Sequence, residues 1–257
     1  MSTILDRIVS ETRQRLSAAP PDRVALEAAI DEMRRTPVDA AARLSAPGPH
    51  IIAEVKRRSP SAGTIREEVD PVATAETYAQ AGASAISILT EPNHFGGSLA
   101  DLSSVAAKVD VPCLRKDFII SDLQLLEARA AGASMALLIV AALSNQELEV
   151  LIASCRALGL LALVETHTHE EIERAVDAGA PLIGVNSRDL RDFSIDIARA
   201  ERLRSAIPNG TLAVAESGIH TPDDLGRLSA AGYDIFLVGT SLMSSEDPAA
   251  TLSALLS

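Results

Sequence analysis

Polar side chains that could carry acid–base chemistry stand directly after apolar runs of this sequence. They are Glu54 and Lys56, Lys116 and Asp117, Glu165, Asn186 and Arg188, Glu216, and Gly239 with Thr240. A single such residue would mean only that a strand has reached solvent. Two lysines and three glutamates in this pattern indicate a shared site, because charges beside a core are costly unless they are paired or functional. Lysine and glutamate together can donate and accept protons.

Two segments that follow predicted strands favour phosphate binding. Ser217-Gly218 and Gly239-Thr240 each combine glycine with a hydroxyl group. Glycine lets backbone N–H groups approach an anion, and the start of a following helix adds a favourable field. Ordinary tight turns are the alternative. We favour a phosphate site because both segments carry the same combination.

Histidine and cysteine give weaker signals. His167 and His169 could suggest a metal pair, but they stand at a predicted helix start without a third ligand, so we expect a solvated loop. Cys113 and Cys155 lack ligand spacing and are predicted to be buried thiols. The other histidines are isolated: His50, His94 and His220. The sequence shows no serine nucleophile elbow and no Cys–His signature.

A repeated unit must position these residues. A helical pattern, then Ala-Gly or a related turn, then an apolar run recurs along the chain, and glycine commonly ends a helix in this way. The eight apolar runs are 51–55, 85–89, 112–115, 135–140, 160–164, 182–185, 212–215 and 235–238. Helix starts are predicted at Asp70, Ser121, Ser144, Thr168 and Thr221.

Strict alternation of strands and helices predicts a parallel sheet. Eight units in this length predict an α/β fold of the (β/α)8 TIM-barrel class. A doubly wound open sheet is the alternative, but it usually has fewer units, and no glycine-rich nucleotide loop is present. In a closed barrel the first, third, fifth and seventh strands place side chains in the same layers. Glu54, Lys116, Glu165 and Glu216 are therefore expected to converge at the carboxyl end of the strands.

Residues 1–46 precede the first strand and are predicted to form a helical extension of a single barrel domain, 1–257. Ile4, Leu5, Ile8 and Val9 recur at helical spacing. A second apolar stripe is expected at Val24, Ala28 and Ile30. Residues 46–49 are predicted to connect this extension to the barrel.

The composition of the chain limits the classes of molecule that it is expected to bind. The 257 residues carry a net charge of −12, so nucleic acid and anionic membranes are not expected partners. Hydrophobic residues make up 47% of the chain and aromatic residues 2%, which suits strands and helices packed through aliphatic side chains. The basic cluster of Lys56, Arg57 and Arg58 contrasts with the acidic charge of the whole chain and predicts a local anion site. The first residues lack the apolar segment of a signal peptide, and we expect a cytoplasmic protein.

These motifs together resemble the indole-3-glycerol-phosphate synthase family of tryptophan biosynthesis. The resemblance is carried by residues 52–61, 87–91, 95–98, 114–118, 137–140, 163–165, 184–190, 215–219 and 237–243, in order along nearly the whole chain. Each motif alone is weak, whereas the set is specific. The resemblance implies a carboxy-lyase that closes the indole ring of 1-(2-carboxyphenylamino)-1-deoxyribulose 5-phosphate, releasing CO₂ and water, in the fourth step from chorismate to tryptophan. It implies no cofactor and no metal.

The same resemblance implies roles for individual residues. Lys116 resembles the general acid of ring closure, and Glu165 the acid–base group of dehydration. Glu54 and Lys56 are implied to assist, with Lys56 near the substrate carboxylate. Substrate-positioning groups would be Asn186, Arg188 and Glu216, the aryl-ring wall Phe95 and Phe118, and the phosphate site Ser59, Ser217, Gly218, Gly239 and Thr240.

Three other functions remain open from the residues alone. A Schiff-base aldolase would also use Lys116. The neighbouring isomerase of the same pathway shares the fold and phosphate site, but its early cysteine near the first strand is missing here. A barrel without catalytic activity is the third, although the charged strand ends argue against it. The expected partner is a phosphorylated small molecule, and the expected state is a monomer or weak homo-oligomer.

Overall fold

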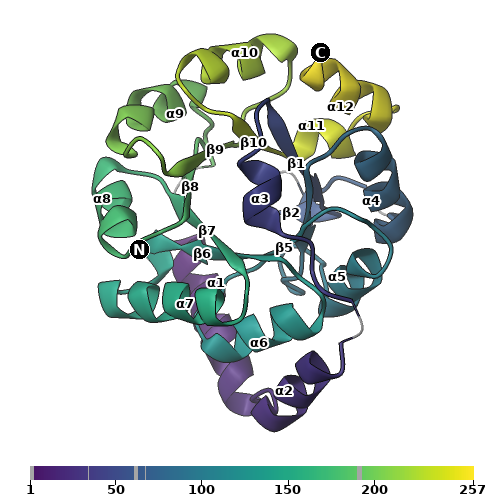
Figure 1. Ribbon diagram of the computed structural model, residues 1–257, viewed down its shortest axis with the longest axis vertical. Helices are drawn as coiled ribbons and strands as arrows, with labels where there is room; N and C mark the ends of the chain where they lie inside the picture. The colour runs from purple at the N-terminus through teal and green to yellow at the C-terminus, as the bar shows by residue number, and fades with distance from the viewer. Residues whose placement is uncertain (1–2, 34, 61–62, 67, 190–192) are drawn as a thin grey trace.

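Eight strands of the computed structural model form a closed parallel barrel (Figure 1). The structure describes residues 3–33, 35–60, 63–66, 68–189 and 193–257. Ser61 and Leu190, at the ends of two of the family motifs, lie outside the described residues. Neighbouring strands follow the order β1-β10-β9-β8-β7-β6-β5-β4, and β4 closes the ring on β1. The predicted (β/α)8 fold is confirmed.

The eight barrel strands lie where the apolar runs predicted them. Their bounds are β1 His50–Val55, β4 Ala85–Leu89, β5 Cys113–Lys116, β6 Met135–Ile139, β7 Leu161–Thr166, β8 Leu182–Asn186, β9 Leu212–Glu216 and β10 Ile235–Val238. Four strands extend past the predicted apolar run and include its polar end residue: Lys116, Glu165, Asn186 and Glu216. The backbone at these four residues is therefore part of a strand, which fixes the direction in which each side chain leaves the barrel wall.

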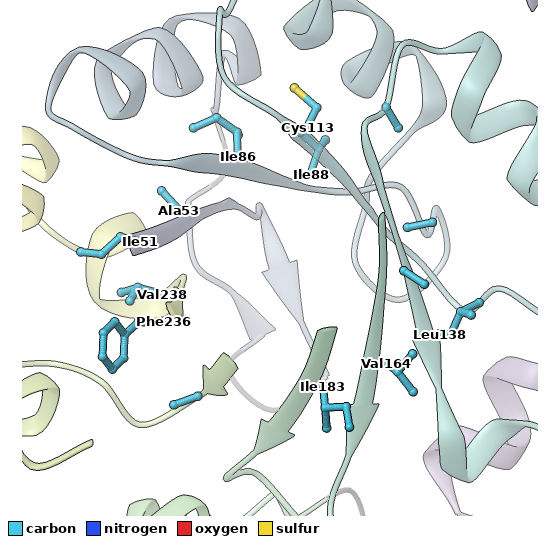
Figure 2. Close-up of a cluster of buried hydrophobic side chains, with 14 of the residues drawn as sticks. Ile51, Ala53, Ile86, Ile88, Cys113, Leu138, Val164, Ile183, Phe236 and Val238 are labelled. Atoms are coloured by element: carbon cyan, nitrogen blue, oxygen red, sulfur yellow. The ribbon is translucent and has the colours of Figure 1, made fainter. Parts of the chain in front are cut away.

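Side-chain alternation separates two cores. Ile51, Ile86, Leu138 and Val164 belong to the outer core between strands and helices, part of which is shown in Figure 2. Residues one position away face the barrel interior: Ile52, Leu114, Leu163 and Val214. Because the period of a strand is two residues, the interior face continues from these residues to Glu54, Lys116, Glu165 and Glu216.

The helices surround the barrel. Their bounds are α4 Pro71–Gln80, α5 Leu99–Ala106, α6 Asp122–Ala130, α7 Asn145–Ala157, α8 His169–Asp177, α9 Ile197–Leu203, α10 Pro222–Ala230, α11 Thr240–Met243 and α12 Pro248–Leu256, with 3-10 turns at Val140–Ala142 and Arg204–Ala206. All five predicted N-caps are present: Asp70, Ser121, Ser144, Thr168 and Thr221. Cap residues satisfy the free N–H groups of each first turn and so fix where each loop ends.

Three helices precede the barrel in the part of the chain that the structure describes: α1 Ile4–Ala18, α2 Arg23–Asp31 and α3 Ala40–Leu44. Leu5 and Ile8 of α1 are buried. Ala40 and Leu44 of α3 join the interior core, and α3 lies over the centre of the barrel in Figure 1. Residues 45–49 form an exposed connection to β1.

The predicted apolar stripe of α2 is wrong. None of the described side chains of α2 is buried, and Val24 is 75% exposed. Instead α2 is attached to the start of α6 through an ion pair between Arg23 and Asp122, with 2.5 Å between nitrogen and oxygen.

Sequence patterns also missed a small antiparallel hairpin in the loop after β1. It consists of β2 Arg58–Ser59 and β3 Gly63–Thr64. Strands of two residues are too short to produce a periodic signal. Among the described residues, no helix is long and apolar enough to cross a membrane.

Candidate active site

One cavity at the carboxyl ends of the strands collects every residue predicted for the site. Its lining includes Glu54, Lys56, Ser59, Phe95, Lys116, Phe118, Glu165, Asn186, Arg188, Glu216, Ser217, Gly218, Gly239 and Thr240. Ile4, Leu5 and Ile8 of α1 line the same cavity. Residues from all parts of the chain meet there because parallel strands of a closed barrel end on one face.

Lys116 lies between two buried carboxylates at the centre of this cavity. Its Nζ is 2.9 Å from Oε2 of Glu165 and 3.3 Å from Oε2 of Glu216. Burial alone would lower the pKa of Lys116, but the charges of Glu165, Glu216 and Glu54 outweigh burial and raise it. The amine is therefore protonated at neutral pH.

The two carboxylates differ in their titration. Burial would raise the pKa of Glu165, yet the nearby charge of Lys116 holds it below its ordinary value. Burial raises the pKa of Glu216, and the charge of Glu165 raises it further. Oε1 of Glu216 is also buried without a hydrogen-bond partner among the described residues. One ammonium ion thus keeps Glu165 ionised and leaves Glu216 disposed to hold a proton.

A second ion pair lies beside the first. Nζ of Lys56 is 2.6 Å from Oε1 of Glu54, and both side chains are largely buried. A Cβ atom at Gly239 would lie 2.5 Å from the same oxygen of Glu54, so the absence of a side chain there makes room for the pair. Gly184 of β8 does the same for Glu216, because a Cβ atom would overlap Oε1 of that carboxylate. Gly184 was missed by sequence reasoning.

The rest of the basic cluster has a structural role. Arg57 pairs with Asp101 at 2.5 Å, and Arg58 donates to the backbone carbonyls of Pro92 and Asn93. Arg57 also donates to the backbone carbonyl of Gly96 at 3.2 Å, so both arginines hold the loop after β4. Among the described residues of this cluster, Lys56 lines the cavity, whereas Arg57 and Arg58 do not.

The segments predicted to bind phosphate have unusual backbones. Ser217 has φ of 67° and Gly218 has φ of 83°. A left-handed conformation is uncommon for serine and is often found at functional sites. Gly239 precedes α11 and provides no side-chain cap for its first turn. Backbone N–H groups are thus left for another acceptor.

An aromatic wall covers one side of the cavity. The rings of Phe95 and Phe118 lie 6.0 Å apart at an angle of 40°. Glu91 holds the loop that carries Phe95, since its carboxylate accepts hydrogen bonds from the backbone N–H groups of residues 93, 94 and 95. Behind Phe118, the buried Asp117 pairs with Arg115 at 2.9 Å. Arg115 faces away from Lys116, as strand alternation predicts, and Asp117 supports the wall.

Comparisons with known proteins decide among the functions that the residues left open. The family model described as indole-3-glycerol phosphate synthase matches residues 5–255. A synthase of this name from Streptomyces griseus subsp. griseus is 48% identical over 99% of this chain and 95% of that relative. One from a Parafrankia species is 52% identical over 82% of this chain and 79% of that relative.

The chain belongs to the indole-3-glycerol phosphate synthase family. It is therefore a decarboxylating carbon–carbon lyase of tryptophan biosynthesis. The comparisons thus select the synthase over the aldolase, the isomerase and the barrel without catalytic activity.

Solved structures at low identity support the same fold. A thiamine phosphate pyrophosphorylase from Pyrococcus furiosus superposes with a TM-score of 0.60 at 16% identity, covering 84% of this chain and 95% of that chain. A mandelate oxidase superposes with a TM-score of 0.60 at 20% identity, covering 81% of this chain and 71% of that chain. Such likeness shows a shared fold and says nothing about the reaction of this synthase-family chain.

One prediction about this synthase-family site is wrong. His167 does not lie in a solvated loop, since its side chain is only 9% exposed. Its Nε2 lies 3.6 Å from Oε1 of Glu165. The residue follows β7 two positions after Glu165, so the alternation that placed Glu165 could also have placed His167 on the same face. His169 is 64% exposed, as expected for a helix start in solvent.

Proposed function

We propose that the cluster around Lys116 carries out the three steps of the family reaction on 1-(2-carboxyphenylamino)-1-deoxyribulose 5-phosphate. The observation that carries this proposal is the protonated amine of Lys116 between Glu165 and Glu216. It supplies a proton donor beside an ionised carboxylate in the cavity. Ring closure and dehydration need this combination.

Ring closure comes first. The aryl carbon that bears the carboxylate attacks the ketone carbon, and the carbonyl electron pair moves to oxygen. Nζ of Lys116 gives its proton to that oxygen, forming a hydroxyl group and leaving a neutral amine. A donor already protonated at neutral pH can do this without first capturing a proton.

Decarboxylation restores the aromatic ring. The bond between the aryl carbon and its carboxylate breaks, its electron pair returns to the ring, and CO₂ leaves. Lys56 would hold the carboxylate until this step, and its ion pair with Glu54 supports this role by keeping the ammonium group in position. Phe95 and Phe118 provide the apolar surface for the aryl ring.

Dehydration completes the indole. The hydroxyl group leaves as water after receiving a proton, and a proton is lost from the former C1 carbon of the sugar. Glu165, kept ionised by Lys116, takes the proton from that carbon and gives it to the hydroxyl group, which leaves as water. The summed steps consume one proton for each substrate, because a carboxylate is lost as neutral CO₂.

Substrate phosphate would bind at Ser59, Ser217, Gly218, Gly239 and Thr240, with Asn186, Arg188 and Glu216 positioning the sugar. The left-handed backbone of Ser217 and Gly218 and the uncapped start of α11 support this assignment. We further expect a cytoplasmic monomer or weak homo-oligomer.

Two experiments test the proposal. The gene should restore growth of a tryptophan auxotroph that lacks the synthase, and the purified protein should release CO₂ while forming the indole product. Lys116→Met should abolish rescue, whereas Lys108→Met, at an exposed lysine, should not. A purified, folded protein that forms no product would overturn the assignment. Covalent trapping of the substrate on Lys116 by borohydride would favour a Schiff-base mechanism instead.

A further inference from the structure

His167 stands between two carboxylates that lead from the buried centre toward solvent. Nε2 lies 3.6 Å from Oε1 of Glu165, and Nδ1 lies 3.5 Å from Oε2 of Glu171 on α8. The backbone N–H group of His167 donates to the same oxygen of Glu171 at 2.6 Å. The three side chains form a line that begins at Glu165, which is 3% exposed, and ends at Glu171, which is 17% exposed.

The imidazole ring of His167 is buried, yet its two nitrogen atoms lack hydrogen bonds within the described part of the chain. Neither ring nitrogen of His167 has a hydrogen-bond partner among the described residues, and both are shielded from solvent. Unpaired buried polar atoms are rare in folded proteins and call for an explanation. Each nitrogen has a carboxylate oxygen within 3.6 Å, and catalytic hydrogen bonds are often long before substrate binds.

The chemistry of the site supplies a reason. Each turnover of the proposed reaction takes up one proton, and both proposed proton-handling groups, Lys116 and Glu165, are largely buried. A substrate seated in the cavity would cover its open side. A route from solvent behind the substrate would then be needed to return the proton.

We propose that His167 is a positioning residue that passes protons between solvent and Glu165, with Glu171 as its outer partner. Glu171, protonated by solvent, gives its proton to Nδ1 of the neutral ring, and the imidazolium releases its Nε2 proton to Oε1 of Glu165. Glu165 passes the proton to the neutral amine of Lys116, 2.9 Å away, and the ring returns to the form protonated on Nε2 before the next turnover. No bond to carbon changes and no electrons are exchanged. The inference rests on the proposed role of Glu165.

The charges around the ring fit this role. Those facing it are Glu165 on β7, Glu171 on α8, Glu216 on β9 and, through Glu165, Lys116 on β5. Burial would lower the pKa of His167, but the carboxylates of Glu171 and Glu165 outweigh burial and raise it above its ordinary value. Both carboxylates therefore favour the protonated form of the ring.

The test compares the pH dependence of kcat in three variants. His167→Gln keeps the size and polarity of the side chain but cannot titrate. Glu171→Gln keeps a carbonyl oxygen for the backbone N–H group of His167 and removes the outer charge. His169→Gln is the matched control, because His169 is exposed and faces Glu173 on the solvent side of α8.

In the wild-type protein kcat should fall as pH rises through the raised pKa of His167. His167→Gln should lower kcat by about tenfold or more, short of the roughly 10²–10⁴-fold cost of losing a direct acid–base group. It should also abolish this alkaline ionisation and leave KM within about twofold. Glu171→Gln should move the ionisation to lower pH, since it removes a charge that raises the pKa.

An unchanged kcat and pH profile in folded His167→Gln would overturn the inference. So would a loss of kcat with the alkaline ionisation retained, because that pattern indicates a structural role. The proposed function would fail differently, through absence of product formation by the wild-type protein or full activity of Lys116→Met. If the wild-type protein is active, Lys116→Met is inactive and His167→Gln is normal, only the relay is wrong.

Discussion

Nζ of Lys116 and Oε2 of Glu165 lie 2.9 Å apart, although 49 residues separate them in the chain. The pair joins β5 to β7 across the barrel interior, where one strand lies between them in the ring. Its placement at the carboxyl ends of the strands makes it both an ion pair and part of the candidate site. The following predictions separate these two roles.

Lys116→Met should reduce kcat by about 10²–10⁴-fold, the usual cost of removing a general acid. The barrel should still fold, because the two freed glutamates can take up a proton rather than remain charged. Single-turnover rate and melting temperature are measured on one preparation, with Lys108→Met as the control. Near-normal chemistry in a less stable protein would show that Lys116 serves only as an ion-pair partner.

Glu216→Gln should make folding stability less sensitive to rising pH between 4.5, the ordinary pKa of glutamate, and the folded value of about 8. The pKa of Glu216 is raised in the folded state, so its stabilising contribution is present at low pH and is lost as pH rises through the folded pKa. Removing the titrating group removes this loss. Melting temperatures of variant and wild type are compared from pH 4.5 to about pH 8. Parallel curves would mean that Glu216 titrates normally.

The contribution of Glu165 to folding stability changes with pH in the opposite direction to that of Glu216. The pKa of Glu165 is lowered on folding, so its contribution is present above the unfolded value and is lost as pH falls through the folded one. Glu165→Gln should therefore flatten the acid side of the stability curve and lower kcat. Thermal unfolding across acid pH checks the first effect, and turnover at neutral pH checks the second. An acid limb as steep as that of the wild type would contradict the lowered pKa.

Gly239→Asp should raise KM strongly, and inorganic phosphate should compete with substrate in the wild-type protein. A fall in kcat is also expected, because a Cβ atom at this position would lie 2.5 Å from Oε1 of Glu54. Gly226→Asp is the control, since a Cβ atom there meets open space on α10. Unchanged KM together with phosphate bound elsewhere would show that the phosphate site is misplaced.

Deleting residues 1–19 should leave a folded barrel with poorer substrate affinity. This change removes α1, whose Ile4, Leu5 and Ile8 line the cavity. It also removes Glu11, whose Oε2 lies 2.7 Å from Nε2 of His94. Deletion of residues 1–46 should also lower stability, because it takes Ala40 and Leu44 out of the interior core. Circular dichroism and steady-state kinetics measure both effects. A deletion of 1–19 with full kcat/KM would rule out a role of α1 in substrate binding.

The sequence by itself determined the local structure and the chemical character of the site. Apolar runs marked all eight strands, and serine, threonine and aspartate marked the predicted helix starts. Strand alternation then assigned Glu54 and Lys116 to the interior and Arg115 to the outer face. These features follow from neighbours within one or two turns, so a sequence pattern contains them.

Tertiary structure alone decided which of these groups touch. Closure of the barrel set Lys116 nearer to Glu165 than to Glu216, placed Gly184 and Gly239 against carboxylates, and enclosed His167. It also left α2 on the surface despite its apolar residues. The physical reason is that these distances depend on strand register and on packing between segments far apart in the chain. Neither strand register nor long-range packing can be read from the propensity of a local segment.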